Sequence, residues 1–235
     1  MDCWICGDPA TTGEHRSKKS DLKAVLGRPT QADPMFLSTD RRRNHTIGSL
    51  DTNRLKSGAR LCASCNNART QPYDFAWERV SDLVRTTLRR NETTEFLRLS
   101  RLVPFETRRT LLHVHLYFVK VFGCHIREAD IPIDLAPFAA AILSGRAHAG
   151  VHLRFCRRET AGLPASVGMT DIWTAVGPGG RCAFATWFYE IDNLAVNVMF
   201  AEDGERREGL VGAWHPRLGT TKLQIFPYDS RGPTA

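Results

Sequence analysis

Cys3-Trp4-Ile5-Cys6 and Cys62-Ala63-Ser64-Cys65 are two Cys-x2-Cys pairs in the first third of this 235-residue chain. Two such pairs can bring four thiolates to one tetrahedral Zn²⁺, and their spacing is typical of closed structural zinc sites. We therefore expect one structural zinc ion with these ligands: Cys3, Cys6, Cys62 and Cys65. A shared ion would fasten the two ends of the N-terminal segment together and would decide how that segment folds.

Three polar residues accompany the cysteine pairs. Glu14 and His15 lie between the pairs, and Asn66 directly follows the second pair. Glu14 follows the first pair closely and Asn66 is bonded to Cys65. A zinc ion that joins the pairs should therefore bring Glu14 and Asn66 near each other.

This order of parts, a Cys-x2-Cys pair, an acidic residue with His, then Cys-x2-Cys-Asn, resembles the HNH endonucleases, which are also known as ββα-metal or His-Me finger endonucleases. It is most similar to their zinc-containing treble-clef branch, which includes recombination endonuclease VII. The resemblance covers about residues 1–80, and residues 81–235 resemble no family. It implies a zinc-bound ββα-metal module that hydrolyses phosphodiester bonds in DNA.

The resemblance also implies a role for each of the three polar residues. His15 would be the general base that activates water, because a neutral imidazole with a pKa of about 6.5 is basic at working pH. Glu14 and Asn66 would hold a catalytic Mg²⁺ or Mn²⁺, because both ions prefer hard oxygen donors. The family more often has Asp where Glu14 stands, and many members have His where Asn66 stands.

Two further residues are alternative members of the same site. The family has a middle asparagine, which usually lies closer to the second cysteine pair than Asn53 does, so Asn53 departs from the pattern. His45, in the long segment between the cysteine pairs, is an alternative general base.

Positive charge is concentrated in the part of the chain that carries the cysteines. Residues 1–70 contain 12 Lys and Arg against 7 Asp and Glu, whereas residues 121–235 contain 11 against 12. Such a distribution is expected of a surface that meets phosphates, so we expect a nucleic acid as partner, DNA by the resemblance. A soluble basic protein without a nucleic-acid partner would show the same charge. The candidate phosphate contacts flank the site or lie in the long loop: Arg16, Lys18, Lys19, Arg41, Arg42, Arg43 and Arg69. Lys23 also flanks the site.

The remaining cysteines and the N-terminus bear on the compartment. Cys124, Cys156 and Cys182 lie apart in apolar segments, and we interpret them as small buried hydrophobic residues. The N-terminus lacks the basic and apolar regions of a secretory signal, and the apolar stretches are too short to cross a bilayer. Paired cysteines without a signal favour metal binding in a reducing compartment, so we expect a cytoplasmic protein that does not contact membranes.

The hydrophobic pattern predicts an α+β fold. Helical spacing occurs in the first half, and β-rich runs separated by turn residues follow from residue 151. We expect a zinc-bound nuclease module (1–80), a helical connector (81–130) and an α+β domain of unknown role (131–235), whose mainly antiparallel sheet has helices on one face. The predicted helices are 20–27, 74–89, 92–102, 107–122 and 134–143. The predicted strands are 151–156, 169–176, 182–189, 194–201 and 223–228, and 28–60 is predicted to be a loop.

Two other functions fit the same residues. A treble clef can be a non-catalytic zinc-finger module that binds nucleic acid or a protein partner. Alternatively, the function could lie in residues 81–235, which could recognise substrate, form oligomers or license the nuclease. By analogy, the two-part layout would suit a phage enzyme or an anti-phage defence effector, and two staggered cuts would favour a homodimer.

Overall fold

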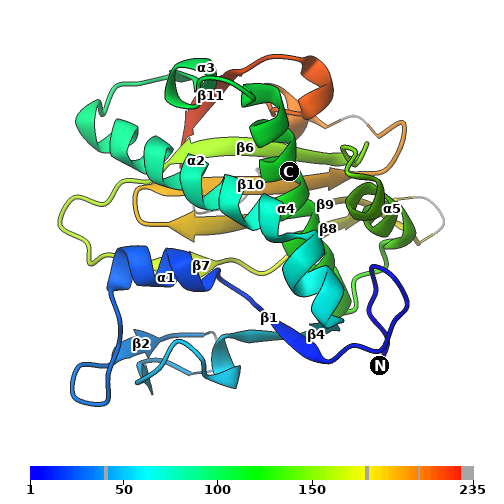
Figure 1. The fold of residues 1–235 in the computed structure, drawn as a ribbon. Coiled ribbons are helices and arrows are strands. Elements are labelled where there is room, and N and C mark those ends of the chain that lie inside the picture. The colour runs from blue at the N-terminus through cyan, green and yellow to red at the C-terminus, as the bar shows by residue number, and fades with distance from the viewer. Residues whose placement is uncertain (40–41, 178–179, 206, 229–235) are drawn as a thin grey trace.

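The largest element of the fold is a seven-stranded sheet, built mainly by the C-terminal half (Figure 1). The computed structural model describes residues 1–39, 42–177, 180–205 and 207–228. The strand order is β5-β11-β6-β10-β9-β7, with β8 also paired to β9. All pairs are antiparallel except β11 with β6, which is parallel. The strands are β5 (Phe96–Arg98), β6 (Val151–Arg157), β7 (Val167–Met169), β8 (Trp173–Val176), β9 (Cys182–Ile191), β10 (Leu194–Ala201) and β11 (Lys222–Pro227).

Two long helices, α2 (Gln71–Arg90) and α4 (Thr107–Ala129), cross over one face of this sheet (Figure 1). On α2, buried apolar residues recur at helical spacing, and the central one, Trp77, is fully buried. Trp77 stacks on Tyr117 of α4, with 5.5 Å between ring centroids, and meets Tyr189 of β9 edge to face. Aromatic burial of this kind is a major source of core stability, so α2, α4 and the sheet form one packed unit. The α+β class is confirmed.

The N-terminal segment lies along one edge of this unit. Strand β1 (Thr12–His15) pairs antiparallel with β4 (Lys56–Leu61), and a wide turn of π-helix (Ser64–Arg69) leads directly into α2. Between β1 and β4 lie the helix α1 (Lys19–Leu26), the hairpin β2 (Met35–Leu37) with β3 (His45–Ile47), and a 3-10 turn (Asn53–Leu55). A small apolar cluster holds this insertion together: Leu22, Ile47, Leu50 and Leu55. The segment predicted to be a loop therefore contains two short strands and the start of a third.

The N-terminal turn that carries Cys3 and Cys6, here called the knuckle, packs against the C-terminal half of α4. A Cβ atom at Gly123 would lie 2.5 Å from the ring of Trp4, so only glycine allows the two to approach this closely. The largest hydrophobic cluster runs from Cys3 to Ile225 and includes residues of all three predicted domains. The division into three domains stays a prediction.

Two predicted elements differ from the structure. The helix predicted at 92–102 is wrong: β5 forms there, followed by the four-residue helix α3 (Leu99–Leu102). Leu97 is buried because it pairs with Leu223 of β11, so the edge of the sheet overrides local helix propensity. The strand predicted at 169–176 is split into β7 and β8, which pair with opposite ends of β9.

The other predicted helices and strands are confirmed, with ends that shift by a few residues. The largest shift is at the C-terminal end of α4, which continues to Ala129, and the last helix is α5 (Ala136–Ser144). None of the helices in the described part of the chain combines the length and the hydrophobicity that crossing a bilayer requires.

Candidate metal centre and adjoining cleft

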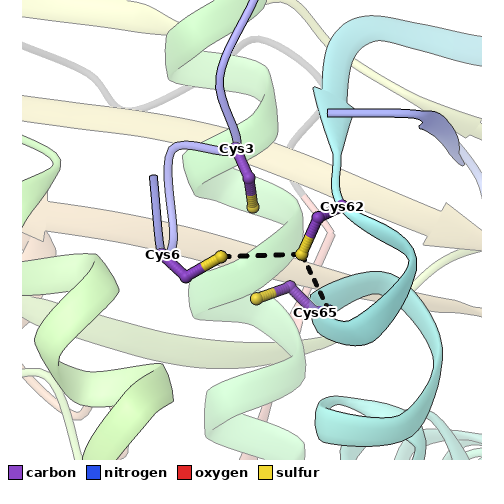
Figure 2. Close-up of side chains that lie close together, drawn as sticks. All are labelled: Cys3, Cys6, Cys62 and Cys65. Carbon is purple, nitrogen blue, oxygen red and sulfur yellow. Dashed lines mark hydrogen bonds between the residues drawn. The ribbon is translucent and has the colours of Figure 1, made fainter. Parts of the chain in front are cut away.

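Four cysteine side chains converge at the junction of the N-terminal knuckle and the start of the π-helical turn (Figure 2). Their Sγ atoms all lie within 4.8 Å of one another, and the atoms of Cys6 and Cys62 are 3.5 Å apart. The knuckle closes through a tight turn in which Gly7, at φ +83°, donates its N–H to the carbonyl of Cys3. The sequence therefore brings the two Cys-x2-Cys pairs together as predicted.

The four sulfur atoms fit a tetrahedral metal ion. With Zn–S bonds of about 2.3 Å, sulfur atoms in a tetrahedral site lie about 3.8 Å apart, close to the observed spacing. The backbone N–H of Cys65 donates to Cys62 Sγ at 3.3 Å and lowers the pKa of the Cys62 thiol. The pKa of Cys6 is raised to about 11 and burial raises the pKa of Cys65, so the geometry, not the thiol pKa values, carries the metal assignment. The cluster is therefore placed to bind a metal ion, and its soft donors suit zinc.

The other three cysteines are buried, as predicted, and lie outside this cluster. Burial raises the pKa of Cys124 and of Cys156 to about 12, and it also raises the pKa of Cys182. Their raised pKa values make these three thiols poor nucleophiles at neutral pH. Cys124 accepts a hydrogen bond from the indole N–H of Trp4 at 3.4 Å, which helps to hold the knuckle on α4.

A polar cleft of about 740 Å³ adjoins the cysteine cluster, and Glu14, His15 and Asn66 all line it. Glu14 and His15 come from the end of β1, where the register with β4 shifts between Gly13 and His15. Asn66 comes from the π-helical turn. The remaining lining residues are mostly charged or polar: Gly13, Lys18, Lys19, Ser20, Lys23, Arg28, Pro29, Ser49, Leu50, Asp51, Asn67, Asp74 and Glu78.

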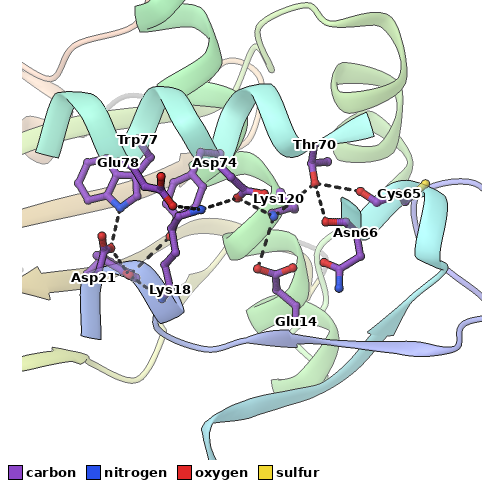
Figure 3. A network of polar contacts seen from close by, with 12 residues as sticks. Glu14, Lys18, Asp21, Cys65, Asn66, Thr70, Asp74, Trp77, Glu78 and Lys120 are labelled. Atoms are coloured by element: carbon purple, nitrogen blue, oxygen red, sulfur yellow. Dashed lines mark hydrogen bonds and ion pairs between the residues drawn. The ribbon is translucent and has the colours of Figure 1, made fainter. Parts of the chain in front are cut away.

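Glu14 is held by a buried cation that the sequence did not indicate (Figure 3). The Nζ atom of Lys120, on α4, lies 3.4 Å from Glu14 Oε1 and 3.0 Å from Asp74 Oδ1. The Lys120 side chain is only 1 % exposed. Burial alone would lower the pKa of Lys120, but the two carboxylates outweigh burial and raise it, so the ammonium stays charged.

One ring nitrogen of His15 forms a hydrogen bond. The Nε2 atom lies 3.0 Å from the carbonyl oxygen of Leu50. A carbonyl can only accept, so the neutral ring carries its proton on Nε2 and its lone pair on Nδ1. In this tautomer Nδ1 can accept a proton.

Asn66 is oriented by a neighbour on β1. Its Nδ2 donates to Thr12 Oγ1 at 3.1 Å. This hydrogen bond fixes the orientation of the side-chain amide, with its oxygen pointing away from Thr12. The backbone N–H of Asn66 also donates to the carbonyl of Cys62. Asn66 is therefore fixed both to the turn that carries Cys62 and Cys65 and to the strand that carries Glu14.

The predicted phosphate contacts are dispersed. Lys18 lines the cleft but pairs with Asp74 at 3.4 Å and with Glu78 at 3.3 Å. Lys19 lines the cleft and pairs with Asp51 at 2.5 Å.

The remaining predicted residues do not line the cleft. Arg16 pairs with Glu128 of α4, and Arg69, Arg43 and Asn53 are exposed. Arg42 and His45 line a separate small pocket of about 170 Å³ with Arg54, and Arg41 lies outside the described residues.

The structure adds residues that sequence reasoning missed, above all Lys120 and Asp74. A lysine inside the otherwise apolar run of α4 was the available signal, because a buried charge must be paired. Comparison with known proteins adds no assignment. No family model matches the chain, and no curated protein or solved structure matches it.

Proposed function

We propose that this protein is a metal-dependent HNH endonuclease that hydrolyses phosphodiester bonds in DNA. One observation carries the proposal: Glu14, His15 and Asn66 line a single cleft next to a four-cysteine cluster. Two antiparallel strands followed by a helical segment surround them, an order that suits a ββα-metal module. In this proposal the cysteines hold a structural zinc ion, which fixes the relative positions of β1 and the π-helical turn.

The residues of the cleft divide the hydrolytic task. His15 Nδ1 accepts the proton of the attacking water, while the Leu50 carbonyl keeps the ring in the required tautomer. The Glu14 carboxylate and the Asn66 amide oxygen are the hard donors that would hold Mg²⁺ or Mn²⁺. Such an ion would offset the negative charge that develops on the phosphate. Thr12 and Lys120 orient these two donors.

One contact favours a second candidate function. The Glu14 carboxylate already has a buried counter-ion in Lys120, so a divalent ion would have to share it. A non-catalytic zinc module that binds nucleic acid or a protein partner would retain this ion pair unchanged. Cleavage assays separate the two functions.

The test is a cleavage assay on supercoiled plasmid with added Mg²⁺ or Mn²⁺. The wild-type protein should yield nicked or linear plasmid, and His15→Ala should lose about 10²–10⁴-fold in rate, the usual contribution of a general base. His45→Ala is the matched control, because His45 lies in the insertion but outside the cleft. Zinc content and melting temperature should be nearly the same in both variants.

Several outcomes would reject the proposal. Absence of cleavage on duplex, branched, single-stranded and RNA substrates with either ion would favour the non-catalytic module. Equal rates for the wild type and His15→Ala would remove the base assignment. When the protein is treated with a chelator, its zinc content is measured afterwards, because loss of the structural ion would also abolish activity.

A further inference from the structure

The basic side chains in the cleft fall into two groups. Lys18 and Lys19 each have a carboxylate partner, as described above. Lys23 and Arg28 also line the cleft and are exposed, and neither forms an ion pair with any residue that the structure describes. Two cations in the cleft are therefore uncommitted.

Each acidic side chain of the cleft has at least one cationic partner. Lys120 forms ion pairs with Glu14 and Asp74, and Lys18 forms ion pairs with Asp74 and Glu78. Lys19 pairs with Asp51 and lowers the pKa of that carboxyl, first through the hydrogen bond between them. Three lysines partner these four carboxylates, so Lys23 and Arg28 bring the cleft from a formal charge of −1 to +1.

The backbone fixes where these two cations stand. Lys19 and Lys23 are one turn apart on α1 and so share a face, which is the face that lines the cleft. The opposite face is anchored by Asp21, whose Oδ2 accepts hydrogen bonds from the Trp77 indole at 2.8 Å and from the Tyr189 hydroxyl at 2.7 Å. Helix α1 is therefore fastened to both α2 and the sheet.

The turn after α1 directs Arg28 to the same cleft. Gly27 ends the helix at φ +77°, a conformation that other residues rarely adopt, and donates its N–H to the carbonyl of Lys23. Arg28 follows at once and lines the cleft with Pro29. The two cations are thus contributed by the last turn of α1 and by the residue after its cap.

We propose that Lys23 and Arg28 bind the phosphates of the nucleic-acid strand that enters the cleft. Lysine acts as a point charge and arginine can bind a phosphate through two parallel hydrogen bonds, so the pair suits a polyanion. Lys23 flanks the site in the sequence, whereas Arg28 was not among the predicted contacts. The inference rests on the proposed function in one respect, which is that the polyanion is a nucleic acid.

The test measures binding of a fluorescent DNA duplex without added divalent ions, so that no cleavage is needed. The double variant Lys23→Gln/Arg28→Gln is compared with Arg101→Gln/Arg108→Gln, which removes the same charge from exposed positions outside the cleft. In duplex DNA each phosphate contact contributes about 0.9 to the slope of log affinity against log salt. The cleft variant should lose about one to two units of slope and about tenfold or more in affinity at low salt.

The outcomes separate this inference from the proposed function. Equal losses in the two double variants would overturn the inference, because net charge alone would then explain binding. Absence of duplex binding by the wild type would overturn it as well. A protein that binds through Lys23 and Arg28 but never cleaves would uphold the inference and reject the nuclease. If the wild type cleaves DNA but the cleft variant keeps the full slope of log affinity against log salt, the nuclease is upheld and the inference is rejected. Unchanged melting temperatures show that both variants are folded.

Discussion

Lys120 Nζ lies 3.4 Å from Glu14 Oε1, and the two residues come from elements far apart in the sequence. The same nitrogen lies 3.0 Å from Asp74 Oδ1 and 3.4 Å from Thr70 Oγ1, so one buried ammonium links β1, α2 and α4 at the wall of the cleft (Figure 3). Removing one member of a buried ion pair leaves the other uncompensated, which costs more than the pair itself contributes.

We therefore predict that Lys120→Met is destabilised by roughly 3 kcal/mol, since it leaves two carboxylates facing an apolar side chain. Urea unfolding monitored by fluorescence measures the change. Lys19→Met is the matched control, because its partner Asp51 is exposed and surface pairs contribute roughly 1 kcal/mol or less. Similar losses of unfolding free energy in both variants would show that the buried ion pairs of Lys120 do not stabilise the cleft more than a surface pair does.

The cysteine cluster predicts a dependence of stability on metal. Cys62→Ser removes one of four thiolates, so we expect loss of bound zinc and a fall of several kcal/mol in unfolding free energy, because structural zinc binding contributes about 10–16 kcal/mol to folding. Zinc per protein chain, measured by elemental analysis, is the direct readout. Cys182→Ser should keep its zinc even if burial of the serine hydroxyl lowers stability. Full zinc occupancy in Cys62→Ser would argue against a shared four-cysteine site.

Four histidines form a second cluster, between α4 and the start of β6, and they are His115, His148, His152 and His215. His148 donates its backbone N–H to His115 Nε2 at 3.2 Å, and the rings of His152 and His215 lie 5.1 Å apart. Burial lowers the pKa of His148 and of His152 to about 4, with smaller contributions from His215. Burial also lowers the pKa of His115 and of His215, next to Arg217. These rings are therefore neutral in the folded protein.

Acid should consequently unfold the protein. The unfolded chain binds protons on His148 and His152 near pH 6.5, whereas the folded chain does not bind them until about pH 4, so the free energy of unfolding falls as pH drops through that interval. The slope is up to about 1.4 kcal/mol per pH unit for each such histidine. Urea unfolding between pH 7.5 and 5 should show a shallower slope for His152→Gln than for the wild type. Zinc release at low pH affects both proteins, so the difference between their slopes is the readout, and equal slopes would contradict the prediction.

The contact between Trp4 and Gly123 predicts a steric effect. Gly123→Ala should be destabilising by about 1–3 kcal/mol, although alanine favours helix, because its methyl group would overlap the indole ring. Trp4→Phe combined with Gly123→Ala should recover part of the loss, since the smaller ring leaves room. Melting temperatures of the single and double variants provide the measurement. Stabilisation by Gly123→Ala alone would mean that the knuckle does not rest on α4.

The sequence was sufficient where the determining interactions are local. The Cys-x2-Cys pairs, the apolar spacing of α2 and the β-rich runs of β9 and β10 predict the metal cluster and most elements of the fold. It was insufficient where a distant partner decides. Strand β5 depends on β11, Arg16 is occupied by Glu128 more than a hundred residues away, and Lys120 reaches Glu14 only because α4 packs against α2. Charge alone cannot distinguish a paired cation such as Lys19 from an unpaired one such as Lys23.

Helix α4 contacts the knuckle, the cleft and strand β4. It carries Gly123 under the knuckle, Lys120 behind the cleft, and Glu128, which accepts hydrogen bonds from Ser57 and Gly58 of β4. A peptide that ends after α2 would retain every residue of the HNH-like pattern and yet lack all three contacts. The arrangement of Glu14, His15 and Asn66 therefore depends on α4, and transferring these residues to another scaffold would require this helix as well.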